Sequence, residues 1–456
     1  MEHITVREIL EATGGRLLCG GEHIPLKHIS IDSRAMAGDD LFVPLIGEKV
    51  DAHRFIGQAF EHGAAAVLTS EHDEMEDERP WIRVEDTKQA LQAIGSYYRK
   101  RLSLPLVGVT GSVGKTTTRE MIAAALSARF RVYKTPGNHN SQVGVPITIS
   151  EISSMDDIGV IELGMSEPGE LTVISKIARI NMAVITNVGI THIEQLGSKE
   201  NIYREKLTIQ DGLTEGGILF LNGDDELLSA TVAREGFKTV YFGTGENCSY
   251  RAVHVRLIEG RAVFTAVHGE ERTTVHLQVM GGHHVQNAMS ALAVARECGV
   301  PLEEAARELE SFTGFQNRQQ IYRNGGLTII DDTYNASPVS MKASLDILRS
   351  LTAEGRRIAV LADMKELGPE ADRYHYEIGT YLAANPVDEV VLLGELSKEI
   401  GRAVRESRSG IAVREFDTMA DLTAYLQADL TEGDCVLFKG SNSMRLKEAA
   451  SHFLPE

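Results

Sequence analysis

The chain has 456 residues, a length that predicts about three domains. Its 65 acidic and 46 basic residues give a formal net charge of −19, which argues against a general nucleic-acid binder and against adhesion to anionic membranes. No run approaches the roughly 18 apolar residues that a membrane-spanning helix needs, so no membrane insertion is expected.

The cysteines are scattered and show neither a Cys-x-x-Cys pair nor a metal-ligand spacing; they are Cys19, Cys248, Cys298 and Cys435. This distribution predicts a reduced, cytoplasmic protein. Residues 1–8 lack the basic segment followed by an apolar segment that marks a signal peptide. We expect a monomer whose partners are small molecules.

Residues 1–82 show the pattern of a small α/β domain. A helix is expected over 6–12, and strands over 29–34, 41–45 and 64–68. The acidic segment 71–79 favours a solvated loop near a domain boundary. Asp86 or Thr87 is expected to cap a helix that continues to about residue 102.

Residues 83–314 alternate strand and helix patterns, which predicts a parallel sheet with ligands at the carboxyl ends of its strands. The expected strands cover 104–109, 158–162, 182–187 and 217–222. Residues 250–280 change to a period of two, which favours an antiparallel patch. Helices are expected to begin near residues 285 and 302.

Residues 315–456 repeat the alternation, with strands expected over 327–331, 357–361, 389–393 and 435–438. This third domain is Rossmann-like but has no Gly-x-Gly-x-x-Gly motif, so we assign it no dinucleotide. The predicted fold class is therefore α/β with three domains.

A phosphate-binding loop is the clearest local signal. The apolar strand 104–109 leads into Thr110-Gly-Ser-Val-Gly-Lys-Thr-Thr, and a helical pattern follows from Lys115 to about residue 129. Gly111 and Gly114 let backbone N–H groups converge on phosphate oxygens at a helix N-terminus. Val109 stands where the general P-loop pattern has its first glycine. The strand–loop–helix context nevertheless predicts nucleotide binding.

Several polar residues follow the central strands and suit a metal site, but each has an ordinary structural interpretation as well. Glu162 at a strand tip could hold Mg²⁺ or cap a helix. His192 could be a hydrogen-bonded loop histidine, and Lys206 a solvated surface charge. The pair Asp224-Asp225 follows another strand. Spacing alone does not decide between these interpretations.

Read together, the motifs resemble the Mur ligase family. After the phosphate loop come, in order, Gly137-Asn-His-Asn140, Ile161-Glu-Leu-Gly-Met, Thr186-Asn-Val-Gly-Ile-Thr-His192, Asn222-x-Asp-Asp and Gly282-His-x-Val-x-Asn287. The third domain adds Asp331-Asp-Thr-Tyr-Asn-Ala-Ser-Pro, Ala362-Asp-Met-x-Glu-Leu-Gly368 and Lys439-Gly-Ser. The front carries Asp32-Ser-Arg and Asp51-x-His. The resemblance covers essentially the whole chain.

The resemblance implies an ATP-dependent amide ligase of peptidoglycan precursor synthesis. The implied reaction joins D-alanyl-D-alanine to UDP-N-acetylmuramoyl-tripeptide through an acyl phosphate, giving the pentapeptide, ADP and phosphate. It also implies a domain order: residues 1–82 bind the UDP-substrate, 83–314 form a P-loop ATPase domain, and 315–456 bind the acceptor. Lysine and diaminopimelate both fit the third position of the tripeptide.

The family's functional positions transfer to this sequence residue by residue. The implied ATP-binding set is Gly111, Ser112, Val113, Gly114, Lys115, Thr116, Thr117, Asn287, Arg318 and Asp332. The implied ligands of two Mg²⁺ ions are Thr116, Glu162, His192 and Lys206, with Lys206 matching a lysine that carries a CO2-derived carbamate. The implied catalytic set is Lys115, His192, Lys206 and Asp332, and the substrate-binding set is Asp32, Ser33, Arg34, Asn138, Tyr334 and Asn335.

The chain also departs from the family pattern, at Ser141, Thr208, His284, Asn317, Ser337, Ala362, Asn442 and Lys447. None of these changes removes the phosphate loop, the metal set or Asp332. They leave acceptor choice open, because Asn442 cannot form the bidentate fork of the usual arginine. The alternatives are therefore a divergent Mur-type ligase with another amino-acid or peptide acceptor, and a nucleotide-binding partner protein without turnover, which would have a broken metal site.

Overall fold

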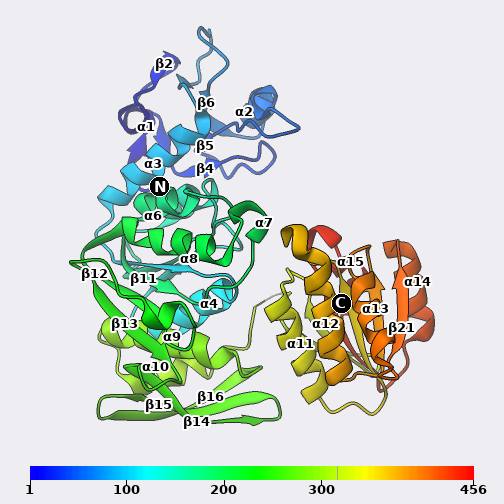
Figure 1. The fold of residues 1–456 in the computed structure, drawn as a ribbon. Coiled ribbons are helices and arrows are strands. Elements are labelled where there is room, and N and C mark those ends of the chain that lie inside the picture. The colour runs from blue at the N-terminus through cyan, green and yellow to red at the C-terminus, as the bar shows by residue number, and fades with distance from the viewer. Residues whose placement is uncertain (316, 456) are drawn as a thin grey trace.

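The computed structural model describes residues 1–315 and 317–455, and it shows an α/β protein of three domains, as the sequence predicts (Figure 1). In the described residues the strands form three large sheets and one pair of short strands, β1 (Ile4–Thr5) with β3 (Pro25–Leu26). No helix in these ranges is both long and apolar enough to cross a membrane.

The first sheet has the strand order β2-β7-β6-β5-β4. Its strands are β2 (Arg16–Cys19), β4 (His28–Ser30), β5 (Asp40–Phe42), β6 (Ala64–Thr69) and β7 (Trp81–Arg83), and only β2 runs antiparallel to its neighbour. Helices α1 (Val6–Thr13), η1 (Ala52–Phe55) and α2 (Ile56–Glu61) accompany it. Strand β7 of this sheet ends at Arg83, one residue beyond the boundary that we predict at residue 82. The limits of the three domains remain predictions.

Two strands of this sheet are shorter than expected. The strand predicted over 29–34 ends at Ser30, because the Asp32 side chain closes a local turn by accepting from the backbone N–H of Arg34. The strand predicted over 41–45 ends at Phe42, two residues before Pro44, which has no N–H to continue the ladder. Segment 71–79 forms the expected loop.

The middle sheet has nine strands in the order β16-β15-β14-β13-β12-β11-β8-β10-β9. They are β8 (Leu106–Thr110), β9 (Val132–Lys134), β10 (Ile158–Glu162), β11 (Ile180–Ile185), β12 (Leu213–Asn222), β13 (Lys238–Gly243), β14 (Tyr250–Ile258), β15 (Arg261–His268) and β16 (Glu271–Met280). Neighbours from β9 to β14 are parallel, and β14, β15 and β16 are antiparallel. The antiparallel patch is therefore confirmed, and it extends the parallel sheet.

Alternate residues of the central strands enter two different cores. Leu106, Ile161 and Ala183 pack with the helices α3, α5 and α6 on one face, whereas Val107, Val160 and Val184 pack with α4, α9 and α10 on the other. The helices are α3 (Thr87–Arg101), α4 (Lys115–Ser127), α5 (Gly144–Glu151), α6 (Glu170–Ala178), α7 (Ile193–Leu196), α8 (Lys199–Leu207), η2 (Thr208–Gly212), η3 (Leu228–Ala230), α9 (His284–Glu297) and α10 (Leu302–Leu309). Asp86 is the cap of α3, accepting from the backbone N–H of Gln89.

The third sheet has the order β17-β18-β22-β19-β20-β21 and is parallel except for β17. Its strands are β17 (Gln320–Asn324), β18 (Leu327–Asp332), β19 (Arg357–Ala362), β20 (Glu389–Leu393), β21 (Ala412–Phe416) and β22 (Cys435–Lys439). The helices are α11 (Pro338–Ser350), η4 (Gly368–Glu370), α12 (Ala371–Ala384), α13 (Lys398–Ser407), α14 (Met419–Asp429), η5 (Asn442–Met444) and α15 (Lys447–Ser451).

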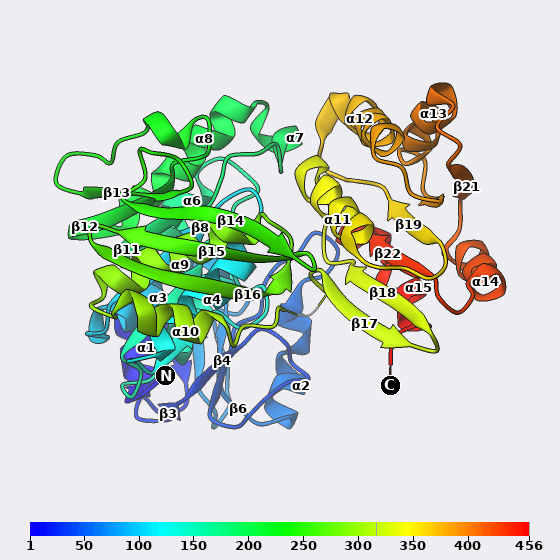
Figure 2. The same cartoon turned by 90° about the horizontal axis from the view of Figure 1, so that it is seen from below.

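The third domain lies beside the middle domain (Figure 1), and contacts between the two include the following pair. Near α7, the backbone N–H of Glu194 donates to the carbonyl oxygen of Glu366. Near α11, the ends of the strands β14 to β16 point toward the third domain (Figure 2), and Met280 packs into that domain's apolar core beside Ile347. The two contacts lie on either side of a space that both domains line.

Arg99 is the buried cation that fastens α3 to the middle domain. Its guanidinium donates to four carbonyl oxygens, those of Ala178, Leu102, Leu104 and Arg179, and burial lowers its pKa to about 10. The guanidinium of Arg99 therefore joins the C-terminal end of α3 to the C-terminal end of α6.

We expect Arg99→Leu to lower the free energy of unfolding by about 2–4 kcal/mol, because buried carbonyl oxygens would lose their donors. Urea titration followed by circular dichroism measures this change. Arg101→Leu is the matched control on the same helix, since Arg101 is exposed, and it should cost less than about 0.5 kcal/mol. Equal effects of the two substitutions would contradict the role of Arg99.

Candidate functional site

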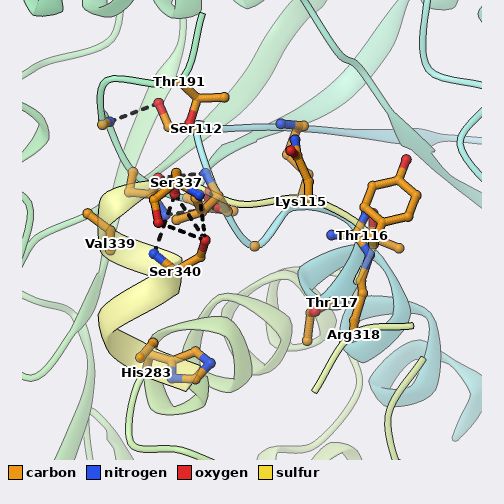
Figure 3. Close-up of a pocket in the computed structure, with 18 of the residues that line it drawn as sticks. Ser112, Lys115, Thr116, Thr117, Thr191, His283, Arg318, Ser337, Val339 and Ser340 are labelled. Atoms are coloured by element: carbon orange, nitrogen blue, oxygen red, sulfur yellow. Dashed lines mark hydrogen bonds between the residues drawn. The ribbon is translucent and has the colours of Figure 1, made fainter. Parts of the chain in front are cut away.

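A cavity of about 610 Å³ lies between the middle and third domains. The middle domain contributes the phosphate loop, the segments after β10 and β11, and the start of α9. The third domain contributes Arg318, Gln319, Asp332, Lys439 and the first turn of α11. Figure 3 shows Lys115, Thr116 and Arg318 in one part of the cavity and Ser337, Val339 and Ser340 in another. Residues from two domains thus meet at one site.

The conformation of the phosphate loop depends on its glycines and on hydrogen bonds to the residues that follow β11. Gly111 has a φ of 153°, and a Cβ there would lie 1.9 Å from Thr186 Oγ1, so no larger residue fits. Asn187 accepts from the Ser112 N–H through its carbonyl oxygen (3.1 Å) and from the Val113 N–H through Oδ1 (3.0 Å). Helix α4 begins at Lys115, so its free N–H groups face the loop.

Lys115 is half-buried in this loop, and its ammonium donates to the carbonyl oxygen of Gly111 at 2.8 Å. Burial lowers the pKa of Lys115, the charge of Glu162 opposes that shift, and the charge of Arg318 adds to it. The Nε of Arg318 is buried and has no hydrogen-bond partner among the described residues. The loop is therefore a concentrated positive site that fits an anion.

Glu162 lies at the tip of β10, directly beside Thr116. Its Oε2 accepts from Thr116 Oγ1 at 2.9 Å and from Arg119 Nη1 at 3.2 Å, and its Oε1 accepts from Asn140 Nδ2 at 2.8 Å. A carboxylate offers about four lone-pair directions, so one remains for a cation. The hydroxyl and carboxylate oxygens fit the hard ligands that Mg²⁺ prefers.

Lys206 is buried, with 2% of its surface exposed, which excludes the surface-charge interpretation. Burial lowers its pKa well below the ordinary value, the charge of Lys115 lowers it further, and the charge of Glu205 opposes the shift. Lys206 forms no ion pair with any residue in the described ranges. Glu205 instead accepts from the N–H groups of Gly169 and Leu171, which fastens α8 to the start of α6.

His192 lines the cavity and begins α7 with a left-handed backbone at a φ of 64°. Its Nδ1 lies 2.6 Å from Oε2 of Glu366 in the third domain. The contact with His192 lowers the pKa of the Glu366 carboxyl group. The imidazole therefore lies against a carboxylate of the third domain, while its buried Nδ1 has no hydrogen bond of acceptable geometry among the described residues.

On the third-domain side, Asp332 and Lys439 form a buried ion pair. The Lys439 ammonium also donates to the carbonyl oxygen of Asn335 at 3.1 Å, which ties the 333–337 loop to β22. The guanidinium of Arg318 lies 3.9 Å from the ring centre of Tyr334, a cation–π contact. Asn287 of α9 accepts from Thr118 on α4 at 3.1 Å.

Some predicted site residues lie away from this cavity. Asp32, Ser33 and Arg34 are in the first domain, where Arg34 forms an exposed ion pair with Asp32. Asn138 is exposed and does not line the cavity, whereas Asn140 of the same motif does. Gly111 and Lys206 are not among the residues that line the cavity.

Sequence reasoning did not select several residues that hold the site together. Arg119 is fully buried and joins Glu162 to the carbonyl oxygen of Gly137, and its position one turn after Lys115 was the available signal. Lys439 and Glu366 stand inside motifs of the third domain, but no local spacing links them to Asp332 or His192. These partners are set by the packing of domains.

The comparisons with known proteins agree with this geometry. Three family models match the chain: "Mur ligase family, catalytic domain" over residues 25–99, "Mur ligase middle domain" over 109–295 and "Mur ligase, glutamate ligase domain" over 317–442. The UDP-N-acetylmuramoyl-tripeptide–D-alanyl-D-alanine ligase of Bacillus subtilis is 37% identical, with 97% of each chain covered. The ligase of the same name from Synechocystis is 35% identical, over 95% of this chain and 93% of that one.

Solved structures show the same similarity across all three domains. MurF from Acinetobacter baumannii matches with a TM-score of 0.87 and 29% identity over 98% of both chains. MurF ligase from Thermotoga maritima, solved in complex with ADP, matches with a TM-score of 0.81 and 29% identity over 94% of this chain and 97% of that one. The chain belongs to the Mur ligase family.

The hydroxyl of Thr116 is the simplest part of the site to test. Thr116→Val keeps the side-chain shape but removes the oxygen beside Glu162, so we expect MgADP to bind about tenfold more weakly. Thr116→Ser keeps the oxygen and should bind nearly as well as the wild type. Calorimetric titration measures both, and in EDTA the difference should largely vanish. Equal MgADP affinities of the valine and serine variants would contradict the assignment.

Proposed function

We propose that the chain joins D-alanyl-D-alanine to UDP-N-acetylmuramoyl-tripeptide with ATP, producing the pentapeptide, ADP and phosphate. The observation that carries this proposal is one cavity lined by the phosphate loop and by the Asp332–Asn335 segment of the third domain. The names of the full-length relatives from Bacillus subtilis and Synechocystis support the choice of substrates.

The phosphate loop is proposed to hold ATP. The N–H groups of residues 111–117 would donate to phosphate oxygens. The ammonium of Lys115, which donates to the Gly111 carbonyl oxygen in this structure, would donate to a phosphate oxygen instead. Asn287, Arg318 and Asp332 would hold the rest of the nucleotide from both domains. The unpartnered Nε of Arg318 is a donor available for that purpose.

Two Mg²⁺ ions are proposed to lie beside the loop, held by Thr116, Glu162, His192 and a carbamate on Lys206. When bound, the ions neutralise charge on the transferred phosphoryl group. Lys206 forms its carbamate when the neutral amine adds to CO2, making an N–C bond and releasing a proton. Its burial and the lack of an ion pair within the described ranges support this proposal, because the anion would also balance Lys115.

The chemistry follows from the poor reactivity of a carboxylate. The γ-phosphoryl group of ATP moves to the terminal carboxylate of the tripeptide, and the acceptor amine then attacks the acyl phosphate, expelling phosphate. The protein orients the reactants and neutralises charge. Third-domain closure over the site would exclude water from the acyl phosphate. Tyr334 and Asn335, which line the cavity, are proposed to contact the acceptor.

The first domain is proposed to bind the uridine nucleotide through Asp32, Ser33 and Arg34, with Asn138 contacting the same substrate. Ser33 is buried against Gln58, whereas Arg34 is exposed and would have to exchange its ion pair with Asp32 for contacts to the nucleotide. We place the enzyme in the cytoplasm as a monomer. The absence of disulfides among its four cysteines supports a reducing compartment.

Phosphate release tests the reaction. With ATP and UDP-N-acetylmuramoyl-tripeptide present, we expect sustained release only when D-alanyl-D-alanine is added, because the acyl phosphate needs an amine to be consumed. If phosphate release requires a different amino acid or peptide, that compound is the acceptor and D-alanyl-D-alanine is not. An absence of release with every acceptor would indicate a binding protein without turnover.

The carbamate is tested by replacing the buried amine. Lys206→Ala should lower turnover by about a hundredfold or more, as loss of a metal ligand or its support does. Excess bicarbonate should not restore activity, whereas short carboxylates should restore part of it. With ¹³C-bicarbonate, a carbamate signal should appear in the wild type and be missing from the variant.

Lys199→Ala is the matched control, since Lys199 lies on the same helix but has a half-exposed side chain that pairs with Glu226. It should keep both turnover and the carbamate signal. Unchanged turnover in Lys206→Ala would remove the proposed role.

A further inference from the structure

The polypeptide crosses from the middle domain to the third domain near Gln319, and the side chain of this residue bridges the two. Its Oε1 accepts from Nε2 of His283 (3.0 Å) and from Nε2 of His284 (3.2 Å), both at the start of α9. Its Nε2 donates to Oγ of Ser344 on α11 at 3.2 Å. One amide group therefore binds both domains at the crossing point.

The bridge continues on both sides to residues of the proposed active site. Toward the phosphate loop, His284 Nδ1 accepts from Asn287 Nδ2 at 3.2 Å, and Asn287 Oδ1 accepts from Thr118 of α4. Toward the acceptor loop, the Ser344 hydroxyl donates to Asp332 Oδ2 at 2.5 Å, and Lys439 joins the same oxygen. A continuous hydrogen-bonded chain thus runs from the helix of the phosphate loop to Asp332.

The direction of each hydrogen bond in this chain is fixed. The Asp332 carboxylate can only accept, so the Ser344 hydroxyl donates to it and accepts from Gln319 Nε2. Gln319 Oε1 then accepts from the Nε2–H of His284, which leaves His284 Nδ1 to accept from Asn287 Nδ2. Burial lowers the pKa of His284 well below the usual value, and the neighbouring His283 lowers it further, so the ring stays neutral. Gln319 must then present its oxygen to the histidines and its NH₂ group to Ser344. No carboxylate or apolar side chain can do both.

The backbone around this residue is also unusual. Asn317 and Gln319 have φ angles of 57° and 52°, in the left-handed region that glutamine rarely adopts. Such a conformation persists only where the surroundings hold it. Arg318 lies between these two residues and stacks on Tyr334. The contacts of Gln319 therefore also fix the place from which Arg318 enters the cavity.

We propose that Gln319 is a positioning residue that couples the nucleotide-binding face of the middle domain to the orientation of Asp332 and Arg318 in the third. A nucleotide bound at the phosphate loop fixes the side-chain orientations of Asn287 and His284. The hydrogen bonds of the Gln319 amide then fix the orientations of Asp332 and Arg318 in the third domain. The inference rests on the proposed function for the identity of the nucleotide. It adds a residue that contacts neither the phosphate loop nor Lys439 directly.

The test is a double-mutant cycle on MgADP binding, measured by calorimetry on the full chain. Gln319→Leu and Asp332→Asn should each weaken binding about fivefold to tenfold. The double variant should bind little more weakly than the weaker-binding single variant, because Gln319 acts through Asp332. Gln319→Glu should behave like Gln319→Leu, since it removes the donor to Ser344.

Gln320→Leu is the control, because the Gln320 side chain accepts a hydrogen bond from Tyr322 of its own domain, and it should leave MgADP affinity unchanged. In turnover, Gln319→Leu should raise the KM for ATP while leaving the KM for the UDP-substrate within twofold of the wild type, a split that a loosened fold would not produce. Multiplicative losses in the double variant, or no loss in Gln319→Leu, would overturn the inference.

The cycle needs no acceptor, so it is independent of the reaction test. Phosphate release by the wild type with another acceptor would change the proposed function and leave the coupling supported. Normal release together with additive binding free energies would keep the proposed function and remove the coupling.

Discussion

Two lysine side chains, the half-buried Lys115 and the fully buried Lys206, lie beside the phosphate loop, and the chemistry of the site depends on the balance of their charge. Lys115 and Lys206 both have lowered pKa values, chiefly through burial, and the charge of Lys115 adds to the shift at Lys206. Glu162 is the nearby acid, but it already accepts hydrogen bonds from Thr116, Arg119 and Asn140. Among the described residues Lys115 forms no ion pair, and its ammonium is held by the carbonyl oxygen of Gly111. A triphosphate and a carbamate would each add negative charge beside these two amines.

The parts of the structure that follow from short-range patterns could be predicted from the sequence. Strand β8, the loop and α4 have an apolar run, two glycines and a helix pattern within about 25 residues, so local chemistry specifies them. The antiparallel strands β14 to β16 have a clear period of two because one face packs on α9 and α10. Glu162 and His192 both lie at the cavity, because the ends of parallel strands and their following loops meet at one edge.

The parts that were missed depend on contacts between distant segments. Strands β17 and β21 are edge strands with polar, partly exposed residues, so they lack the apolar signal of a central strand. Asn140 was passed over for Asn138 because only the folded loop turns Asn140 toward Glu162. Glu366 and Gln319 owe their roles to the third domain's position beside α7 and α9. No spacing in the sequence encodes that position.

The packing of Met280 has a consequence for how the chain can be divided. Met280 ends the last strand of the nine-stranded sheet, yet its side chain fills part of the apolar core formed by α11 and the third sheet. If the chain were cut between the two domains, the third domain would lose the side chain of Met280 from its core. The same side chain would be exposed to solvent on the middle domain. The middle domain therefore contributes one side chain to the apolar core of the third domain, and separating the two would remove that packing.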